Sequence, residues 1–384
     1  MTSNPIISEV QTYESGELSF NIKNVDVSIV NGLRRACQSN VTSLVFKGFP
    51  HNESNINIVK NTTKFHNEYI KHRLQCVPIY ETNTEVYENY RELYKIRLRA
   101  KNTTLNKMYI TTNNFEFIEK ETNEPHPNSS EKINKLFRPD PISGDGILIL
   151  VLMPHYNKSE KPDEIDMEIE FDIGTSSENS CWNIVCKSVY ENIQDVDKVN
   201  AAIQKLQEDE NKSDMEIRDF QILDAQRLYK NREFKFTIQS IGVHENQKIV
   251  DMACKYIIDS MNELIQEMNN ITSITKQDDI EQIQNTNTFN LYIHDEMDEF
   301  IVLKVGRDDY TLGKLIENHL YSIFRDDLEF VGFEKEHATK KEAYIYIKYM
   351  NNDDSKSFIR NHIKTVAENI IETYKSIQTE IYKN

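Results

Sequence analysis

The sequence predicts an α+β protein in which one chain carries two related α/β halves, with a mostly β domain inserted into the first half. Three observations lead to this prediction. A strand pattern followed by a helix-start phrase occurs near each end of the chain. Each half closes with a long amphipathic helix, and short strand patterns fill the segment between the first phrase and its closing helix.

The strand-helix phrase repeats without a gap 283 positions further along the chain. Residues 18–22 alternate apolar and polar side chains, and residues 301–305 form the apolar counterpart. The helix-start phrases are residues 26–29 and 309–312, so we expect a serine or threonine to cap each helix. The repeat indicates two related domains packed on each other as a fused dimer.

The first half begins with this strand and a helix over residues 28–39, after which the pattern changes to short strands and turns. The predicted strands are residues 94–98, 109–111, 146–152 and 165–171. Residues 122–130 form a loop because they are rich in Pro, Asn and Ser. A domain inserted into a loop of another domain explains this change of character.

Both halves end with a strand and a long amphipathic helix. In the first half the strand is residues 233–241, and the helix carries an apolar stripe from Ile249 to Met268. The second half has strands at 299–305 and 343–349 and a helix at 311–323. Its closing helix has the stripe Phe358, Ile359, Ile363, Val366, Ile370, Tyr374 and Ile377. The two closing helices are expected to pair across a pseudo-two-fold interface.

These patterns set the expected domain boundaries. They are 1–45 for the first part of half 1, 46–187 for the inserted domain, 188–269 for the second part of half 1, 270–290 for a polar linker and 291–384 for half 2. Within half 1, residues 192–230 are acidic, prone to form helix and low in apolar content, which is typical of a surface excursion.

Composition restricts the function. With 45 Lys+Arg against 62 Asp+Glu the net charge is −17, which argues against direct sequence-specific nucleic-acid contact. Five scattered cysteines are too few for a disulfide framework and suit a reducing compartment. No signal peptide, transmembrane run, GxxxxGK[ST] or GxGxxG motif appears, so we expect a cytoplasmic protein without a nucleotide loop.

Three phrases occur in the order VNGLRRACQSNV, FHNEYIKHRLQCVPI and PISGDGILILVLMP. In this order they resemble the third-largest subunit of eukaryotic nuclear RNA polymerase, the archaeal D subunit and the bacterial alpha-subunit N-terminal domain. Cys181-Trp182 weakly resembles a later Lys-Trp phrase of that family. The end of the chain resembles the eleventh subunit (archaeal L). Its signatures read here as residues 310–316, YTLGKLI, and as Phe330-Val331-Gly332-Phe333 with His337.

The resemblance implies an assembly platform that performs no chemistry: a dimer that holds the two large catalytic subunits and that further small subunits join. A single-chain fusion resembles the arrangement in large cytoplasmic DNA viruses, which implies a location in viral factories and virions. When the contact positions of the family are transferred to this sequence, the contacts to the large subunits fall on Asn31, Arg34, Arg35 and Arg73. Positions assigned to dimerisation are Leu33, Ile257, Met261, Leu264, Thr311, Leu312, Gly313, Leu315, Ile363, Val366 and Ile370.

Metal sites are not expected. Many relatives carry a four-cysteine zinc loop in the inserted domain, but residues 80–180 contain no cysteine here, so we predict no structural zinc. Catalytic magnesium would belong to a partner subunit. His66, Glu68 and His72 fit no ligand spacing, and Cys181 and Cys186 are expected to be buried free thiols. The Asp pairs at 308–309, 326–327 and 353–354 have no phosphate-binding companion.

Three readings of function remain open at this stage. The Arg34-Arg35 pair is either a contact with a large subunit or an ordinary solvated helix face. The main alternative to a polymerase subunit is a stand-alone interaction or regulatory module that uses the same dimerisation fold. An enzyme ranks third, because no motif gives converging titratable groups. Under the interface reading, Arg35→Glu leaves the chain folded and blocks recruitment of the second-largest subunit.

Overall fold

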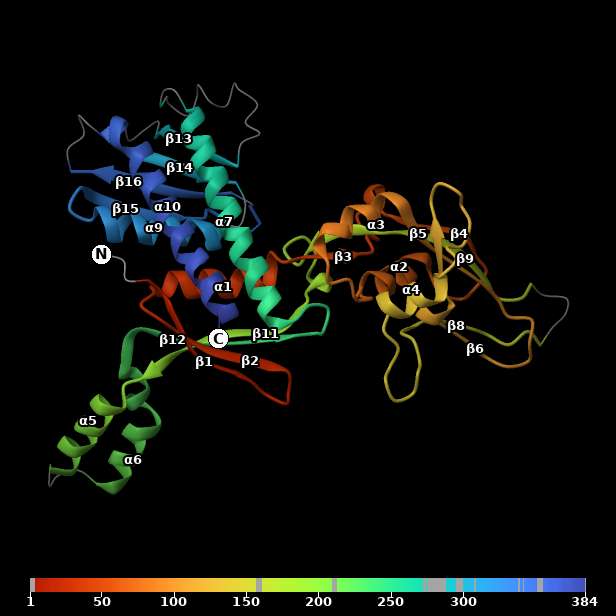
Figure 1. The fold of residues 1–384 in the computed structure, drawn as a ribbon, viewed down its shortest axis with the longest axis horizontal. Coiled ribbons are helices and arrows are strands. Elements are labelled where there is room, and N and C mark those ends of the chain that lie inside the picture. Colours follow the sequence, from red (N-terminus) through yellow and green to blue (C-terminus); the bar gives the residue numbers. More distant parts are fainter. Residues whose placement is uncertain are drawn as a thin grey trace. The chain divides into compact units, whose positions relative to one another are not determined.

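The computed structural model describes residues 4–156, 161–208, 213–271, 274, 288–294, 300–306, 309–337, 339–340, 342–350 and 355–383. These residues form helices and antiparallel sheets, which confirms the predicted α+β class (Figure 1). The chain forms two compact units. Unit 1 joins the residues up to Cys37 with Lys187–Gln239 and the residues from Asn246 onward, and unit 2 joins Gln38–Cys186 with Ser240–Glu245.

The first half of unit 1 is built on a four-stranded sheet in the order β1-β2-β12-β11. Its elements are β1 (Ile6–Thr12), β2 (Glu17–Lys23), α1 (Val27–Ser39), β11 (Val185–Gln194), β12 (Tyr229–Ser240) and α7 (Asn246–Asn270). Antiparallel pairing places Phe236 opposite Phe20, and their rings stack with centroids 5.3 Å apart. Strand alternation therefore turns one face of β2 and β12 into core.

The second half has a four-stranded sheet in the order β13-β14-β16-β15. Its elements are β13 (Phe289–Ile293), β14 (Ile301–Val305), α9 (Asp309–Phe324), β15 (Leu328–Glu334), β16 (Ala343–Tyr349) and α10 (Ser355–Lys383). Ile301 and Leu303 pair with Ile347 and Ile345, and all four side chains are buried. This sheet is therefore an apolar layer like the first one.

The two halves share one topology. In chain order each reads β-β-α-β-β-α, and in each sheet the fourth strand lies between the second and the third. This agreement confirms the two related halves predicted from the repeat. Unit 2 enters the first half after α1 as Gln38–Cys186 and takes a second short segment, Ser240–Glu245, at the end of β12. The predicted domain bounds, 46–187 for the insert among them, stay predictions.

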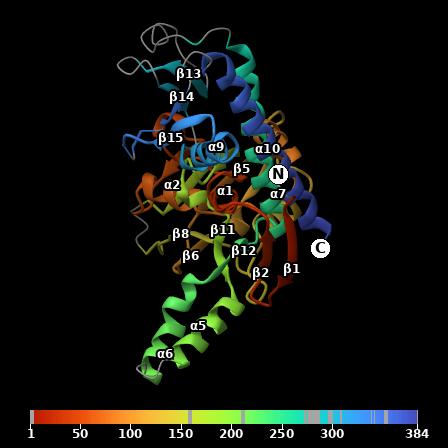
Figure 2. The same ribbon diagram turned by 90° about the vertical axis from the view of Figure 1, so that its left-hand side faces the viewer.

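The closing helices α7 and α10 lie side by side in both ribbon views (Figures 1 and 2). The α7 stripe from Ile249 to Met268 is buried except for Ile265, which is partly exposed, and the α10 stripe is buried from Ile359 to Ile381. Phe358, which was predicted to belong to the α10 stripe, is 48% exposed. Burying such stripes against each other removes apolar surface from water and joins the two halves. No helix among the described residues is long and apolar enough to cross a lipid bilayer.

The predicted helix caps were wrong in detail. Asp26, not Ser28, precedes α1 and caps it, because its Oδ1 accepts the backbone N–H of Ser28 at 2.8 Å. Ser28 lies inside the first turn. In the second half α9 begins at Asp309, so Thr311 is also inside its helix. A carboxylate satisfies free N–H groups at a helix start at least as well as a hydroxyl does. Its negative charge also interacts favourably with the positive end of the helix dipole.

The acidic excursion is a pair of helices between β11 and β12. They are α5 (Val196–Glu208) and α6 (Asp214–Ile222), followed by the 3₁₀ turn η5 (Asp224–Arg227). Both views show the pair extending away from the sheet (Figures 1 and 2). Val199 is the one buried residue in these two helices among those the structure describes, as expected for a surface excursion. Most of the predicted linker 270–290 lies outside the described residues.

Unit 2 contains three small antiparallel sheets within its described residues. The strands are β3 (Thr42–Val45) with β10 (Asp172–Thr175); β4 (Ile56–Asn61), β9 (Glu164–Glu170), β5 (Tyr94–Lys101) and β7 (Glu116–Glu119); and β6 (Met108–Thr111) with β8 (Leu148–Leu152). The helices are α2 (Asn67–Gln75), α3 (Tyr87–Leu93) and α4 (Ser129–Leu136), with 3₁₀ turns η1 (His51–Glu53), η2 (Thr84–Val86), η3 (Thr112–Asn114) and η4 (Ser180–Trp182). An aromatic and aliphatic cluster forms the core, in which Phe46 contacts Phe137 and Phe171.

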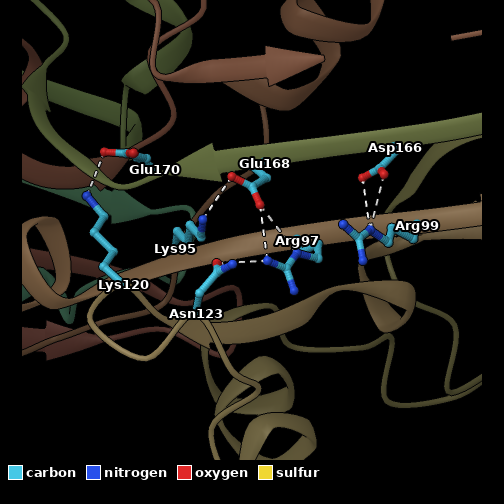
Figure 3. A network of polar contacts seen from close by, with 8 residues as sticks. All are labelled: Lys95, Arg97, Arg99, Lys120, Asn123, Asp166, Glu168 and Glu170. Carbon is cyan, nitrogen blue, oxygen red and sulfur yellow. Dashed lines mark hydrogen bonds and ion pairs between the residues drawn. The ribbon is translucent and has the colours of Figure 1, made fainter. Parts of the chain in front are cut away.

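A network of ion pairs crosses β5 and β9 (Figure 3). Glu168 is its centre: one carboxylate oxygen accepts from Lys95 Nζ at 2.8 Å, and the other accepts from Arg97 at 3.1 Å. Arg97 is almost fully buried and also donates to the amide oxygen of Asn123 at 2.9 Å. The hydrogen bond from Lys95 is the main cause that keeps the pKa of Glu168 below its ordinary value.

Glu168→Ala should lower the free energy of unfolding by about 3 kcal/mol, because it leaves the buried Arg97 guanidinium without its carboxylate. Urea unfolding of the full chain measures this change. Asp166→Asn is the matched control on the same strand. It removes an ion pair with the exposed Arg99, so it should cost less than about 1 kcal/mol. Equal losses in the two variants would contradict the central role of Glu168.

Candidate assembly interface

Helix α1 approaches the second half closely at Gly32. A Cβ at this position would lie 2.7 Å from Tyr374 Oη of α10 and 3.0 Å from a methyl carbon of Leu315 of α9. Tyr374 is fully buried, and its hydroxyl donates a hydrogen bond of 2.9 Å to the carbonyl oxygen of Ile29. The absence of a side chain therefore lets α10 reach the backbone of α1.

Arg35 connects α1 to α9. Its Nε donates to Thr311 Oγ1 at 3.0 Å, and its guanidinium lies 5.7 Å from the ring centroid of Tyr310. The side chain is half-buried. Arg35 thus contacts the second half of the same chain, a contact that the linear sequence gave no means of predicting. An Arg35→Glu variant would disturb this contact as well as any external one.

Asn31 and Arg34 form a pair on the same helix. Arg34 Nε donates to Asn31 Oδ1 at 3.0 Å, and the backbone carbonyl of Arg34 accepts from Ser188 Oγ of β11. Burial and, secondly, the neighbouring positive charge of Arg35 lower the pKa of Arg34. Both effects mean that a carboxylate or carbonyl partner would stabilise this guanidinium.

A groove of about 540 Å³ lies between α1 and α9. We call it the α1–α9 groove, and it is lined by Val27, Ser28, Asn31, Tyr190, Lys314, Glu317, Asn318, Tyr321 and Val331. The positions equivalent to Asn31, Arg34 and Arg35 in the repeat are Lys314, Glu317 and Asn318. Of these positions, Asn31 on α1 and all three on α9 line the groove, so the two helices present different chemistry there.

The wall of the groove on α9 is polar and ordered. Lys314 Nζ pairs with Glu317 at 2.6 Å, and the Asn318 amide donates to Asp26 Oδ1 across to the start of α1. Val27 and Tyr321 are large apolar side chains that remain 45% and 48% exposed. An exposed apolar pair beside fixed polar groups is typical of a protein-binding surface. Val27, Tyr190 and Tyr321 were not among the predicted site residues, because no pattern in the surrounding sequence distinguishes them.

His319 lies behind this wall, where its Nδ1 is 2.8 Å from the carbonyl oxygen of Leu315. Burial is the main influence on its pKa and lowers it; the hydrogen bond and Asp26 oppose this, and Arg232 acts with burial. At a pH above about 6.5, the pKa of histidine in an unfolded chain, His319 is neutral in both states and does not reduce the free energy of unfolding. Below that pH the unfolded chain binds a proton that the folded chain does not bind, which favours unfolding.

The stability of unit 1 should therefore fall as the pH decreases below about 6.5, and His319→Gln should reduce that dependence. Thermal unfolding of the full chain between pH 7.5 and about 5.5, a window above most carboxyl titrations, measures it. His66→Gln is the control, because the His66 side chain is 78% exposed. An unchanged pH slope in His319→Gln would contradict the assignment.

Arg73 lies in unit 2 and is engaged within that unit. Its guanidinium donates to the carbonyl oxygens of Ile149 and Leu148 at 2.8 and 2.6 Å, and it lies beside the ring of Tyr69. These bonds attach α2 to β8. The predicted role of Arg73 at a large subunit stays a prediction, as do those of Asn31, Arg34 and Arg35.

All residues assigned to dimerisation are buried: Leu33, Ile257, Met261, Leu264, Thr311, Leu312, Gly313, Leu315, Ile363, Val366 and Ile370. Leu315 faces Gly32 across the two halves, and Thr311 accepts the bond from Arg35. Gly313 instead contacts its own half, because a Cβ there would lie 2.3 Å from the ring of Phe333. Gly313 therefore lets α9 pack on β15.

The histidines considered as metal ligands, His66 and His72, make structural contacts in unit 2. His66 caps α2 by accepting the N–H of Glu68, and His72 stacks on Phe49 at 4.4 Å. Cys186 is exposed, which corrects its predicted burial: on β11 it points opposite to the buried Val185. Cys181 is half-buried. The described residues contain no group of three or more His, Cys, Asp or Glu side chains that could hold a metal ion. Asp308 and 353–354 lie outside them.

The topology and the joined halves define the chain as a dimerisation scaffold. Residues 19–261 match the RNA polymerase Rpb3/Rpb11 dimerisation domain. The chain belongs to this family. The family is non-catalytic and interacts with other polymerase subunits. The second half lies outside the matched range.

One further protein resembles the chain at low sequence identity. The chain is similar to a conjugation stage-specific protein of Tetrahymena thermophila, with 24% identity over 188 residues. The similarity covers 46% of this chain and 56% of that protein. It therefore adds a related sequence and no further function.

Proposed function

We propose that this chain is the platform on which the two large catalytic subunits of a DNA-dependent RNA polymerase assemble. The α1–α9 groove is the observation that supports this most. A platform for two different large subunits needs two different faces, and the repeat supplies equivalent positions with unequal chemistry. Asn31 on α1 corresponds to Lys314 on α9, and both line the groove; Arg34 corresponds to Glu317, of which Glu317 lines it. On this proposal α1 faces the second-largest subunit and α9 lies nearer the largest.

The proposal includes the fusion of two partners in one chain. The first half with unit 2 corresponds to a third-largest subunit, and the second half corresponds to an eleventh subunit. The shared β-β-α-β-β-α order supports this, because it places the elements of both partners in one polypeptide. The setting we propose is a large cytoplasmic DNA virus, with the chain in viral factories and virions, where immunolabelling would locate it.

Two exposed apolar residues allow the faces to be tested separately. Val27→Asp on α1 should weaken binding of the second-largest subunit, and Tyr321→Asp on α9 should weaken binding of the largest. Co-expression of the full chain with both large subunits and a pull-down measure the two losses. Because both side chains are exposed, circular dichroism should show folded variants. Full retention of both subunits by both variants would contradict the proposed faces.

We also propose that the chain needs no structural zinc. The apolar core that runs through unit 2 supports this, because burial of these side chains stabilises the unit without a metal. Incubation with a zinc chelator should therefore leave the melting temperature unchanged, and elemental analysis of the purified chain should find far less than one zinc per chain. A melting temperature that falls on chelation and recovers with added zinc would contradict this.

A further inference from the structure

Unit 2 contains a cavity of about 170 Å³ whose wall includes two thiols. Cys76 follows the last turn of α2, and Cys181 lies in the 3₁₀ turn η4. The chain positions are far apart, but both residues lie in the wall of this cavity. Cys76 is exposed and Cys181 is half-buried. One thiol is thus open to solvent and the other lies behind it.

The two thiols interact directly. Burial, the charge of Cys76 and a side-chain hydrogen bond with Cys76 together raise the pKa of Cys181 to about 11. Backbone bonds fix both positions, since the Cys76 N–H donates to Arg73 and Leu74 carbonyls and the Cys181 N–H donates to Asn179. The two thiols therefore share one cavity wall and influence each other there.

Two residues of the cavity wall have a buried N–H donor without a hydrogen-bond acceptor among the described residues: Gln75 at Nε2 and Trp182 at Nε1. Gln75 is 3% exposed and Trp182 is 6% exposed. The Trp182 ring lies against Gly174, where a Cβ would be 2.7 Å away, so the ring is fixed. Buried donors of this kind stabilise an oxygen that gains negative charge.

We propose that Cys76 and Cys181 form a peroxide-reactive dithiol, with Cys76 as the attacking thiol and Cys181 as the resolving thiol. This site is separate from the assembly role and does not depend on it. The pair is chosen over the other cysteines because Cys37 and Cys254 are fully buried and Cys186 does not line this cavity.

The chemistry balances with a hydroperoxide as oxidant. The sulfur of Cys76 attacks the peroxide, so an S–O bond forms, the O–O bond breaks, and the alcohol or water leaves with the proton of Cys76. The Gln75 and Trp182 donors stabilise the leaving oxygen. The sulfur of Cys181 then attacks the sulfur of Cys76, an S–S bond forms, and water leaves with the proton of Cys181. The thiols lose two electrons and the peroxide gains them.

The test treats the full chain with hydrogen peroxide at a small molar excess, blocks free thiols with an alkylating reagent and maps the peptides by mass spectrometry. We expect a peptide pair linked through Cys76 and Cys181, and a loss of two of the five thiols, reversed by dithiothreitol. Cys186→Ser is the matched control and should behave like the parent chain. Free Cys76 and Cys181 after treatment, or disulfides between chains only, would overturn the proposal.

Two variants test the assigned roles. In Cys181→Ser, Cys76 should stop at the sulfenic acid, which dimedone traps; no adduct at Cys76 would contradict its role as the attacking thiol. Trp182→Phe keeps a ring against Gly174 and removes the N–H, so the first step should slow by about tenfold or more. An unchanged rate in a folded Trp182→Phe chain would remove the donor from the proposed site.

Discussion

Replacing Gly32 by leucine should lower the free energy of unfolding of unit 1 by at least about 3 kcal/mol. The new side chain would have to enter the space that Tyr374 Oη and Leu315 occupy, at 2.7 and 3.0 Å from the position of its Cβ. All of these groups are buried, so the clash is relieved only by moving α10 or α9 away from α1. Denaturant unfolding followed by the circular dichroism signal of the helices measures the loss.

A double-mutant cycle shows whether Tyr374 is the group that requires glycine. Gly32→Ala and Tyr374→Phe should each destabilise the chain, the second because it removes the hydrogen bond to Ile29. The double variant should be less destabilised than the two losses added, since the phenylalanine ring leaves room for the alanine methyl group. Additive losses would mean that Leu315 or the backbone, and not Tyr374, excludes a side chain.

Arg34→Glu should abolish most binding of the second-largest subunit, with a fall in affinity of about tenfold or more. Reversing a charge inside an interface places like charges opposite each other, which costs several kcal/mol. Arg34 is a better test than Arg35, because Arg34 bonds Asn31 of its own helix, whereas Arg35 bonds Thr311 of the second half. Pull-down of the second-largest subunit by the purified full chain measures the change.

Lys255→Glu is the matched charge reversal for this experiment. Lys255 is exposed on α7 and lies on neither helix of the α1–α9 groove, so its reversal should leave binding intact. Normal binding by Arg34→Glu, or an equal loss in Lys255→Glu, would contradict a specific contact at Arg34.

Periodic apolar patterns made the fold largely predictable. The repeat of 18–22 at 301–305 and the stripes of α7 and α10 depend on burial along a strand or helix, which a single sequence records directly. The expected helix 249–268 became Asn246–Asn270, and the expected strand 233–241 became Tyr229–Ser240. Both elements are present in the structure, and only their end residues differ from the prediction.

Other elements gave weaker signals. Strand β1 pairs only with β2 at the edge of its sheet, and of its residues Ile7 alone is buried, so no clear alternation marks it. β13 was partly assigned to the linker because polar residues precede it, and β15 has mixed burial. Such strands are fixed by the neighbours they pair with rather than by their own pattern.

The candidate site was predictable only in part. The resemblance selected the helix that carries Asn31, Arg34 and Arg35, but it could not show that Arg35 bonds the second half or that Tyr374 reaches Ile29. Those contacts join residues hundreds of positions apart, and no local pattern encodes them. The α1–α9 groove likewise exists only when both halves are folded together.

The central claim, an assembly platform for two large polymerase subunits, is tested most directly by native affinity purification of this chain and identification of its stoichiometric partners. We predict two very large subunits at one copy each, no separate eleventh-subunit-like protein, and template-dependent RNA synthesis in the eluate. A chain that elutes alone, or with partners unrelated to transcription, would contradict the claim.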